Sequence, residues 1–318
     1  MTRRRAMVVV SLLTAVLLTA AGAIAAYPEK AIEMIIIFEA GGAADISGRM
    51  LAQVAEKSLK VPIAPINKPG AGGAVGLAAI ANSRPDGYTV GWITGSLLTA
   101  TNMGNLPFDY QALDYVALVN LEPTAIAVRA DAPWASLKEF VADARQKPGK
   151  LRIGNAGSGS FTHISAAALA HKARIEVRHV PLGARRMPSL LGGEVEAVSI
   201  HPPEIISNLK AGKVRVLGIS FPAPVTALKG VPTWKDLGWD VGFYQFRGLA
   251  APKGLPEAAV KRLEAAFREA AQSESYRALA DETAITIGLQ DSAGFRAFVQ
   301  QQDGLIKAVI KELGIAKK

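Results

Sequence analysis

The 318-residue sequence predicts an α/β fold of about two domains, in which helices flank parallel sheets. Short apolar runs typical of buried strands alternate with longer amphipathic segments typical of helices. Glycine-rich stretches stand between a strand and a helix, as at residues 40–45 and 157–163. About 290 residues follow an N-terminal leader, and that length suits two domains of ordinary size.

The first 25 residues have the pattern of a secretory signal peptide. Residues 3–5 are arginines, 7–18 form an apolar run, and Ala23-Ile24-Ala25 supplies the small residues that signal peptidase requires. The alternative is a single membrane anchor, but the run is shorter than the roughly 20 apolar residues that a span needs. We therefore expect a soluble mature protein that begins at Ala26.

Local signals divide the mature chain into alternating strands and helices. The turn Arg84-Pro85-Asp86-Gly87 introduces a strand, and Pro148-Gly149 ends a helix. Near the end, Val260, Leu263 and Phe267 recur at helical spacing on one apolar face. We expect strands at 33–38, 88–93, 124–128, 151–154, 177–181, 195–200 and 214–220, and helices at 46–59, 136–146, 165–172, 203–209 and 256–281.

The composition excludes several classes of function. The sequence has no cysteine, which excludes thiol chemistry and zinc–thiolate sites. Three of the four histidines stand eight residues apart, unlike the i, i+3 or i, i+4 pairs typical of metal ligands, so we expect no metal. The formal net charge is +9, but the basic residues do not form the stripe that nucleic-acid binding needs. A positive field still attracts small anions.

Three glycine-rich stretches, at 40–45, 68–73 and 157–163, are candidates for anion binding. A glycine turn before a helix directs backbone N–H groups toward a ligand, and the helix dipole adds positive potential there. The third stretch adds hydroxyl donors for a carboxylate. For the first stretch, the alternative is an ordinary tight turn in which Asp45 caps the helix.

The sequence carries no motif for a cofactor or for catalysis. Residues 70–76 miss the dinucleotide fingerprint, and no P-loop lysine is present. No serine stands in G-x-S-x-G, and the spacing of Ser160 and His163 is more typical of a helix cap than of a nucleophile with its base. We therefore expect a protein that captures a small carboxylate, uses no cofactor and is not an enzyme.

Short motifs follow one another in order along nearly the whole mature chain. They include Tyr27-Pro28-Glu29-Lys30, Asn67-Lys68-Pro69-Gly70-Ala71-Gly72-Gly73, Pro85-Asp86-Gly87-Tyr88-Thr89 and Arg247-Gly248-Leu249-Ala250-Ala251-Pro252. In this order they resemble the substrate-binding proteins of tripartite tricarboxylate transporters, the Bug-type receptors.

The resemblance implies a type II periplasmic binding protein, with two α/β lobes and a ligand cleft between them. One lobe would comprise residues 26–125 and 228–318, and the other residues 126–227. Such a protein is a periplasmic monomer that binds a small mono-, di- or tricarboxylate and passes it to membrane permease subunits. Two alternatives stay open: a ligand sensor for a membrane signalling partner, and an exported hydrolase.

The resemblance also implies which residues bind the ligand. Carried over to this sequence they are Ala40, Gly41, Gly42, Asp45, Ser96, Thr99, Ser158, Gly159, Ser160 and Thr162.

The sequence departs from the family pattern at several positions near these residues. Glu39 replaces an uncharged residue, Ala44 replaces a common hydroxyl, Phe246 replaces a frequent tryptophan, and the turn at 182–186 lacks a tyrosine. Glu39 would repel an anion or pair with an amine, and Arg185 would bind a second carboxylate and select diacids. The alternative is that both are solvated loop charges.

Overall fold

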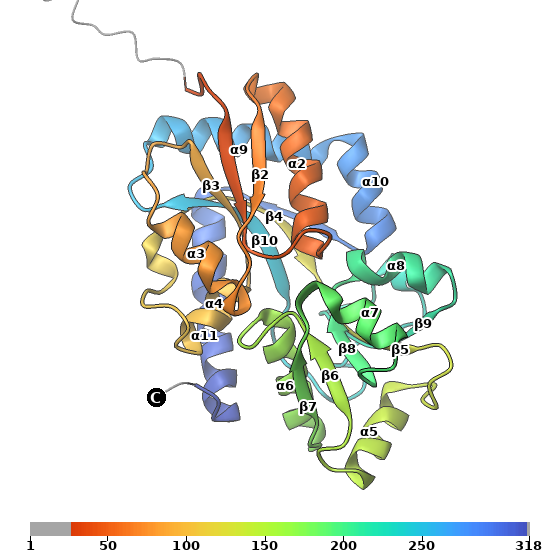
Figure 1. The fold of residues 1–318 in the computed structure, drawn as a ribbon. Helices are drawn as coiled ribbons and strands as arrows, with labels where there is room; N and C mark the ends of the chain where they lie inside the picture. The colour runs from red at the N-terminus through yellow and green to blue at the C-terminus, as the bar shows by residue number, and fades with distance from the viewer. Residues whose placement is uncertain (1–26, 317–318) are drawn as a thin grey trace, which may run out of the picture.

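The computed structural model describes residues 27–316, so the expected signal peptide lies outside the described residues. Two β-sheets with their helices form two lobes, drawn in the upper and lower halves of Figure 1. This confirms the expected two-lobed α/β fold.

Lobe 1 is built on a six-stranded sheet with the order β11-β4-β10-β3-β1-β2. Apolar side chains cover both faces of this sheet, as expected for a sheet packed between helices. Its strands are β1 (Ile32–Ile36), β2 (Ile63–Asn67), β3 (Thr89–Thr94), β4 (Leu113–Glu122), β10 (Gln245–Pro252) and β11 (Thr286–Gln290). Its helices are α2 (Ala43–Leu59), α3 (Ala74–Ala81), α4 (Ser96–Asn102), α9 (Glu257–Gln272), α10 (Glu274–Thr283) and α11 (Ser292–Leu313).

Lobe 2 is built on a five-stranded sheet with the order β7-β6-β8-β5-β9. Its strands are β5 (Thr124–Arg129), β6 (Arg152–Asn155), β7 (Arg178–Pro181), β8 (Ala197–Ile200) and β9 (Val214–Ser220). Its helices are α5 (Leu137–Gln146), α6 (Phe161–Ala173), α7 (Arg186–Leu191) and α8 (Pro202–Lys210).

The chain crosses between the lobes at two places. β4 continues into β5 through Pro123, and residues 221–244 join β9 to β10. Within this second connection the backbone N–H of Trp234 donates to the carbonyl oxygen of Ile219 at 2.8 Å, so this part packs on lobe 2. The expected lobe boundaries at 125/126 and 227/228 stay predictions.

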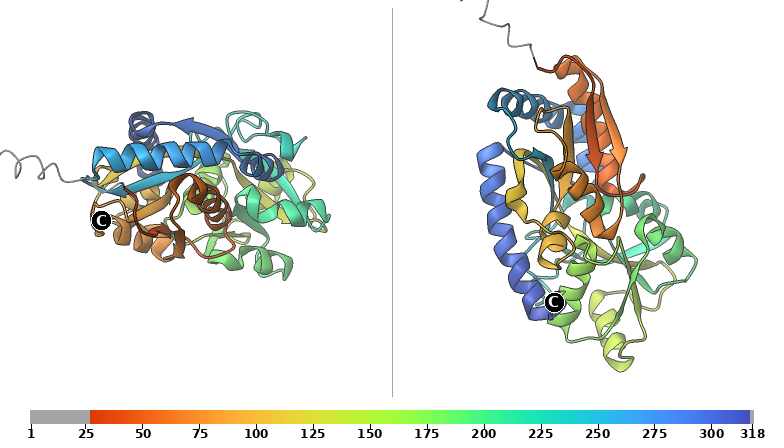
Figure 2. Two further views of the ribbon diagram at one scale, coloured as in Figure 1. Left: turned by 90° about the horizontal axis from the view of Figure 1, so that it is seen from above. Right: turned by 60° about the vertical axis from the view of Figure 1, so that its left-hand side comes forward.

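The C-terminal helix α11 reaches both lobes. It packs against β4 in lobe 1, and Glu312 near its end pairs with Lys172 of α6 at 3.1 Å. Figure 2 shows α11 running along one side of the molecule past both sheets. This helix therefore links the lobes in addition to the two chain crossings.

Two expectations about the elements were wrong. Residues 256–281 form two helices, because Ser273 has extended backbone (ψ 151°) and its side chain caps α10 by accepting from the N–H of Tyr276 at 3.2 Å. The sheets are mixed and not all parallel: β10 is antiparallel to β3 and β4, and β5 is antiparallel to β8 and β9. β11 is also antiparallel to β4, and every antiparallel pair includes a strand next to a lobe crossing, namely β4, β5 or β10.

Candidate functional site

A pocket lies between the lobes, and residues of both lobes line it. Lobe 1 contributes the loop after β1, the start of α4 and the start of β10. Lobe 2 contributes the loop before α6 and the starts of α7 and α8. The polar or loop residues that line it include Glu39, Gly42, Ala43, Ser96, Ser160, Thr162, Arg186, His201, Glu204, Gln245 and Arg247.

The glycine loop, residues 39–45, leads from β1 into α2. Gly42 is the N-cap of α2 and has no side chain, so it leaves the first-turn amides of the helix without a cap from this position. Gly42, Ala43 and Ala44 line the pocket, whereas Ala40 and Gly41 are exposed and do not. Of the residues expected here, the structure brings Gly42 to the pocket.

The side chain of Asp45 makes its hydrogen bonds within the protein, and its expected role in ligand binding stays a prediction. Its buried carboxylate accepts from the backbone N–H of Gly41 at 3.0 Å, from Nε of Arg49 at 2.7 Å and from Nδ2 of Asn67 at 2.9 Å. It is not among the pocket-lining residues. Asp45 therefore holds the glycine loop in shape.

The hydroxyl loop, residues 156–162, faces the glycine loop from lobe 2. Ser160 is the N-cap of α6 and its Oγ accepts from the N–H of His163 at 3.3 Å. The hydroxyl oxygen of Thr162 lies 3.2 Å from that of Ser160 and accepts from the N–H of Ala156 at 3.0 Å. Both side chains are buried and line the pocket, whereas Ser158 is exposed and lines a neighbouring hollow.

Two hydrogen bonds close the lobes beside the pocket. The N–H of Phe161 donates to Oγ of Ser96 at 3.1 Å, and Oγ1 of Thr99 donates to the carbonyl oxygen of Gly159 at 2.7 Å. Ser96 lines the pocket, but Thr99 and Gly159 do not. Thr99 and Gly159 thus form a contact between the lobes.

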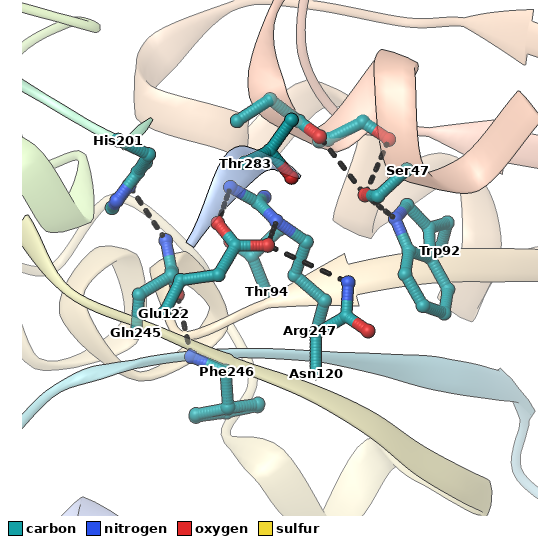
Figure 3. Close-up of polar contacts among 12 residues, drawn as sticks. Ser47, Trp92, Thr94, Asn120, Glu122, His201, Gln245, Phe246, Arg247 and Thr283 are labelled. Carbon is teal, nitrogen blue, oxygen red and sulfur yellow. Dashed lines mark hydrogen bonds and ion pairs between the residues drawn. The ribbon is translucent and has the colours of Figure 1, made fainter. Parts of the chain in front are cut away.

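Two buried ion pairs form the floor of the pocket, and sequence reasoning missed both. Arg247 on β10 binds Glu122 at the end of β4 through Nε and Nη2, each at 2.8 Å. Arg186 at the start of α7 binds Glu204 on α8 through Nη2 at 2.6 Å. Figure 3 shows the Arg247 guanidinium facing the Glu122 carboxylate. The sequence did contain a signal for these ion pairs, because each pair has a charged residue within or beside an apolar segment. A charge that is buried in this way needs a partner of opposite charge.

His201 lies where both chain crossings meet. Its Nδ1 is 3.1 Å from the carbonyl oxygen of Pro123, so Nδ1 carries the proton, and Nε2 accepts from Nε2 of Gln245 at 3.2 Å. The amide oxygen of Gln245 in turn accepts from the N–H groups of Gly95 and Phe246, at 2.8 and 3.1 Å. This chain of hydrogen bonds, partly drawn in Figure 3, fixes His201 as a neutral imidazole.

Burial shifts the protonation of the groups on the floor. The pKa of His201 is held well below its usual range, first by burial and then by the positive charge of Arg247, while the carbonyl of Pro123 opposes the shift. Burial raises the pKa of Glu204 from 4.5, although the charges of Arg186 and Arg247 and the backbone amide of Ala43 oppose it. The Ala43 amide belongs to the first turn of α2, so Glu204 lies next to the N-terminus of that helix.

The two adjacent arginines at the start of α7 differ in position. Arg185 is exposed and does not line the pocket, whereas Arg186 is 5% exposed and does. Arg186 is fixed further by a hydrogen bond from its Nε to the carbonyl oxygen of Gly183 at 2.8 Å. The expectation that Arg185 binds a second carboxylate stays a prediction.

Comparison with known proteins decides the family. Residues 48–315 match the family described as tripartite tricarboxylate transporter family receptor. The chain belongs to this receptor family. A UPF0065 protein in the gbd 5' region of Cupriavidus necator is 32% identical over 92% of this chain and 90% of its own length.

Solved structures agree on the fold of the receptor. A periplasmic transporter is 29% identical, with a TM-score of 0.87 over 91% of this chain and 99% of its own. MatC from Rhodopseudomonas palustris, solved with bound malate, has a TM-score of 0.84 over 89% of this chain and 100% of its own. At 23% identity the MatC structure speaks to the fold alone.

The described part of the receptor has neither a membrane-spanning helix nor a cluster of metal ligands. Within residues 27–316, no helix has both the length and the apolar character needed to cross a membrane. The same residues form no cluster of three or more His, Asp or Glu side chains suited to a metal ion.

Proposed function

We propose that the protein captures a small organic carboxylate in the periplasm and delivers it to the membrane subunits of a tripartite tricarboxylate transporter. The observation that carries this proposal is the convergence of hydrogen-bond donors from both lobes on one pocket. Ser96 comes from lobe 1, Ser160 and Thr162 come from lobe 2, and the guanidinium groups of Arg186 and Arg247 lie at the floor.

Some of these donors have hydrogen atoms that the protein itself does not use, so they can bond to a ligand. Ser160 and Thr162 share one hydrogen bond, so one of the two hydroxyl protons is left to donate. Arg247 uses Nε and Nη2 on Glu122, and its Nη1 has no partner among residues 27–316. Hydrogen bonds from such groups to a carboxylate are short and strong because the acceptor is charged.

Binding would be coupled to lobe closure. A carboxylate that touches Ser96 and Ser160 at once makes its full contacts only when the lobes are together, so it shifts the population toward the closed state. The Ser96–Phe161 and Thr99–Gly159 hydrogen bonds would hold that state. The membrane subunits would then recognise the closed receptor, which we propose to be a monomer.

A thermal-shift screen of mono-, di- and tricarboxylates and amino acids tests the proposal. A true ligand at about 100 times its dissociation constant adds about 2.7 kcal/mol to the free energy of unfolding, which raises the melting temperature by several degrees. Calorimetry of the best acids then gives affinities. If no carboxylate stabilises the protein at millimolar concentration, the proposal is contradicted.

The periplasmic location has its own test. We propose that residues 1–25 direct export and are removed, so that the mature protein begins at or within two residues of Ala26. N-terminal sequencing of the protein from a periplasmic fraction gives the start directly. An intact N-terminus beginning at Met1 in the membrane fraction would contradict export by a cleaved signal.

A further inference from the structure

The positive charges of the pocket are already neutralised by the protein itself. Arg247 pairs with Glu122 at 2.8 Å and Arg186 pairs with Glu204 at 2.6 Å, and all four side chains are at least nine-tenths buried. The amide of Ala43, at the start of α2, faces Glu204 as well. A ligand therefore meets strong donors in this pocket but no excess of positive charge.

Glu39 is the pocket charge that has no such partner. Glu39 lies on the border of the pocket and the neighbouring hollow and is partly buried. Its carboxylate has no Lys, Arg or His nitrogen within 4.0 Å among residues 27–316. It also reaches across to lobe 2, because a Cβ on Gly183 would lie 2.8 Å from its Oε1. Lobe closure thus brings an unpaired carboxylate against the backbone of the opposite lobe.

The balance of charges follows from these contacts. The pocket and its ion-pair partners contain two guanidinium groups, Arg186 and Arg247, and three carboxylates, Glu39, Glu122 and Glu204. His201 adds no charge, because its two ring nitrogens are a donor and an acceptor. A ligand with only carboxylate groups would add negative charge to a pocket in which carboxylates already outnumber guanidinium groups by one. The repulsion between the ligand and Glu39 is costly because both groups are partly buried.

We propose that the ligand is an amino acid, that is, a carboxylate that also carries an ammonium group, and that Glu39 binds the ammonium. This inference rests on the proposed function, since the ligand's carboxylate still binds the hydroxyls of Ser96, Ser160 and Thr162. The ammonium would pair with the Glu39 carboxylate next to Gly183, where the pocket meets the neighbouring hollow. The zwitterion leaves the pocket with the charge that it had before binding.

Calorimetry with matched pairs of acids tests this inference. The pairs are succinate and aspartate, glutarate and glutamate, and butyrate and γ-aminobutyrate, whose members differ by one ammonium group. For at least one pair, the wild-type protein binds the ammonium-bearing member at least tenfold more tightly, about 1.4 kcal/mol. Glu39→Gln, which keeps the side-chain shape, reduces that preference to less than threefold and weakens only the ammonium-bearing member.

Glu269→Gln is the matched control. It removes the same charge from an exposed position on α9 that does not line the pocket, and it leaves the preference unchanged. Equal weakening of both members by Glu39→Gln, or tighter binding of the plain member of every pair by the wild type, overturns the inference. In either case the proposed function stands. Failure of every pair and of every tricarboxylate to bind contradicts both.

Discussion

The glycine loop and the hydroxyl loop face each other across the cleft, yet they use their polar side chains differently. In the glycine loop the carboxylate of Asp45 accepts hydrogen bonds from Gly41, Arg49 and Asn67. In the hydroxyl loop Ser160 and Thr162 line the pocket. A loop that presents backbone amides needs a side chain to fix its shape. The N-cap serine is held by its helix, and Ser160 and Thr162 together keep one hydroxyl proton for a ligand.

The sharpest test of this contrast is Asp45→Ala. We expect it to lower the free energy of unfolding by about 3 kcal/mol, because it leaves the donors of Gly41, Arg49 and Asn67 without their acceptor. Urea unfolding measures the change. Asp131→Ala is the control, since its ion pair with Arg129 is exposed and should be worth under about 0.5 kcal/mol. A stable Asp45→Ala protein that fails to bind would instead place Asp45 at the ligand.

Acid should destabilise the protein through two histidines beside the hydroxyl loop, His163 and His179, whose ring centres lie 5.0 Å apart. Nδ1 of His163 accepts from the N–H of Gly159 at 3.1 Å and so must be unprotonated. Burial lowers the pKa of His163, and burial together with His163 lowers the pKa of His179 to about 4. The unfolded chain takes up protons near pH 6.5 and the folded protein does not, so stability is highest above pH 6.5 and falls as the pH decreases toward 4.

For His179 alone, this loss is about 2 kcal/mol between pH 7 and pH 5, at about 1.4 kcal/mol per pH unit below 6.5. Urea unfolding at the two pH values measures it. His179→Asn should remove most of this loss of about 2 kcal/mol, so that the free energy of unfolding changes less between pH 7 and pH 5. An unchanged dependence in the variant would show that His179 is protonated equally in the folded and unfolded states.

Ser160→Ala tests the binding side of the contrast. We expect it to weaken the best carboxylate by about 1.5 kcal/mol, since it removes a hydrogen bond to a charged group. Ser136→Ala is the matched control: Ser136 caps α5 as Ser160 caps α6, but it does not line the pocket. Both variants lose a cap worth about 1 kcal/mol of stability, and only Ser160→Ala should lose affinity in calorimetry. Equal affinities would assign Ser160 to structure alone.

Arg185→Ala should have the smallest effect. The side chain is exposed and outside the pocket lining, so we expect less than about 0.5 kcal/mol in stability and in affinity for any acid. Calorimetry with one monoacid and one diacid checks this. A tenfold loss for the diacid alone would support the role that the sequence predicted for Arg185.

The fold and the two loops could be predicted because their signals are local. Apolar runs, glycine turns and capping residues predicted the five strands of lobe 2, β1 and β3 of lobe 1, and the loops that carry Gly42, Ser160 and Thr162. They did not predict β2, β4, β10 or β11 of lobe 1. The floor of the pocket could not be predicted in this way, because Arg247 and Glu122 are 125 residues apart. Nor could local signals separate Arg185 from Arg186, since only the packing of α7 decides which side chain faces inward.

A crystal structure with the tightest-binding acid from the screen tests the central claim most directly. We expect a carboxylate of the ligand within hydrogen-bond distance of Ser160 or Thr162 in lobe 2 and of Ser96 or Arg247 in lobe 1, with the lobes closed. A ligand held by one lobe alone, or bound in the outer hollow beside Ser158, would contradict capture by donors from both lobes.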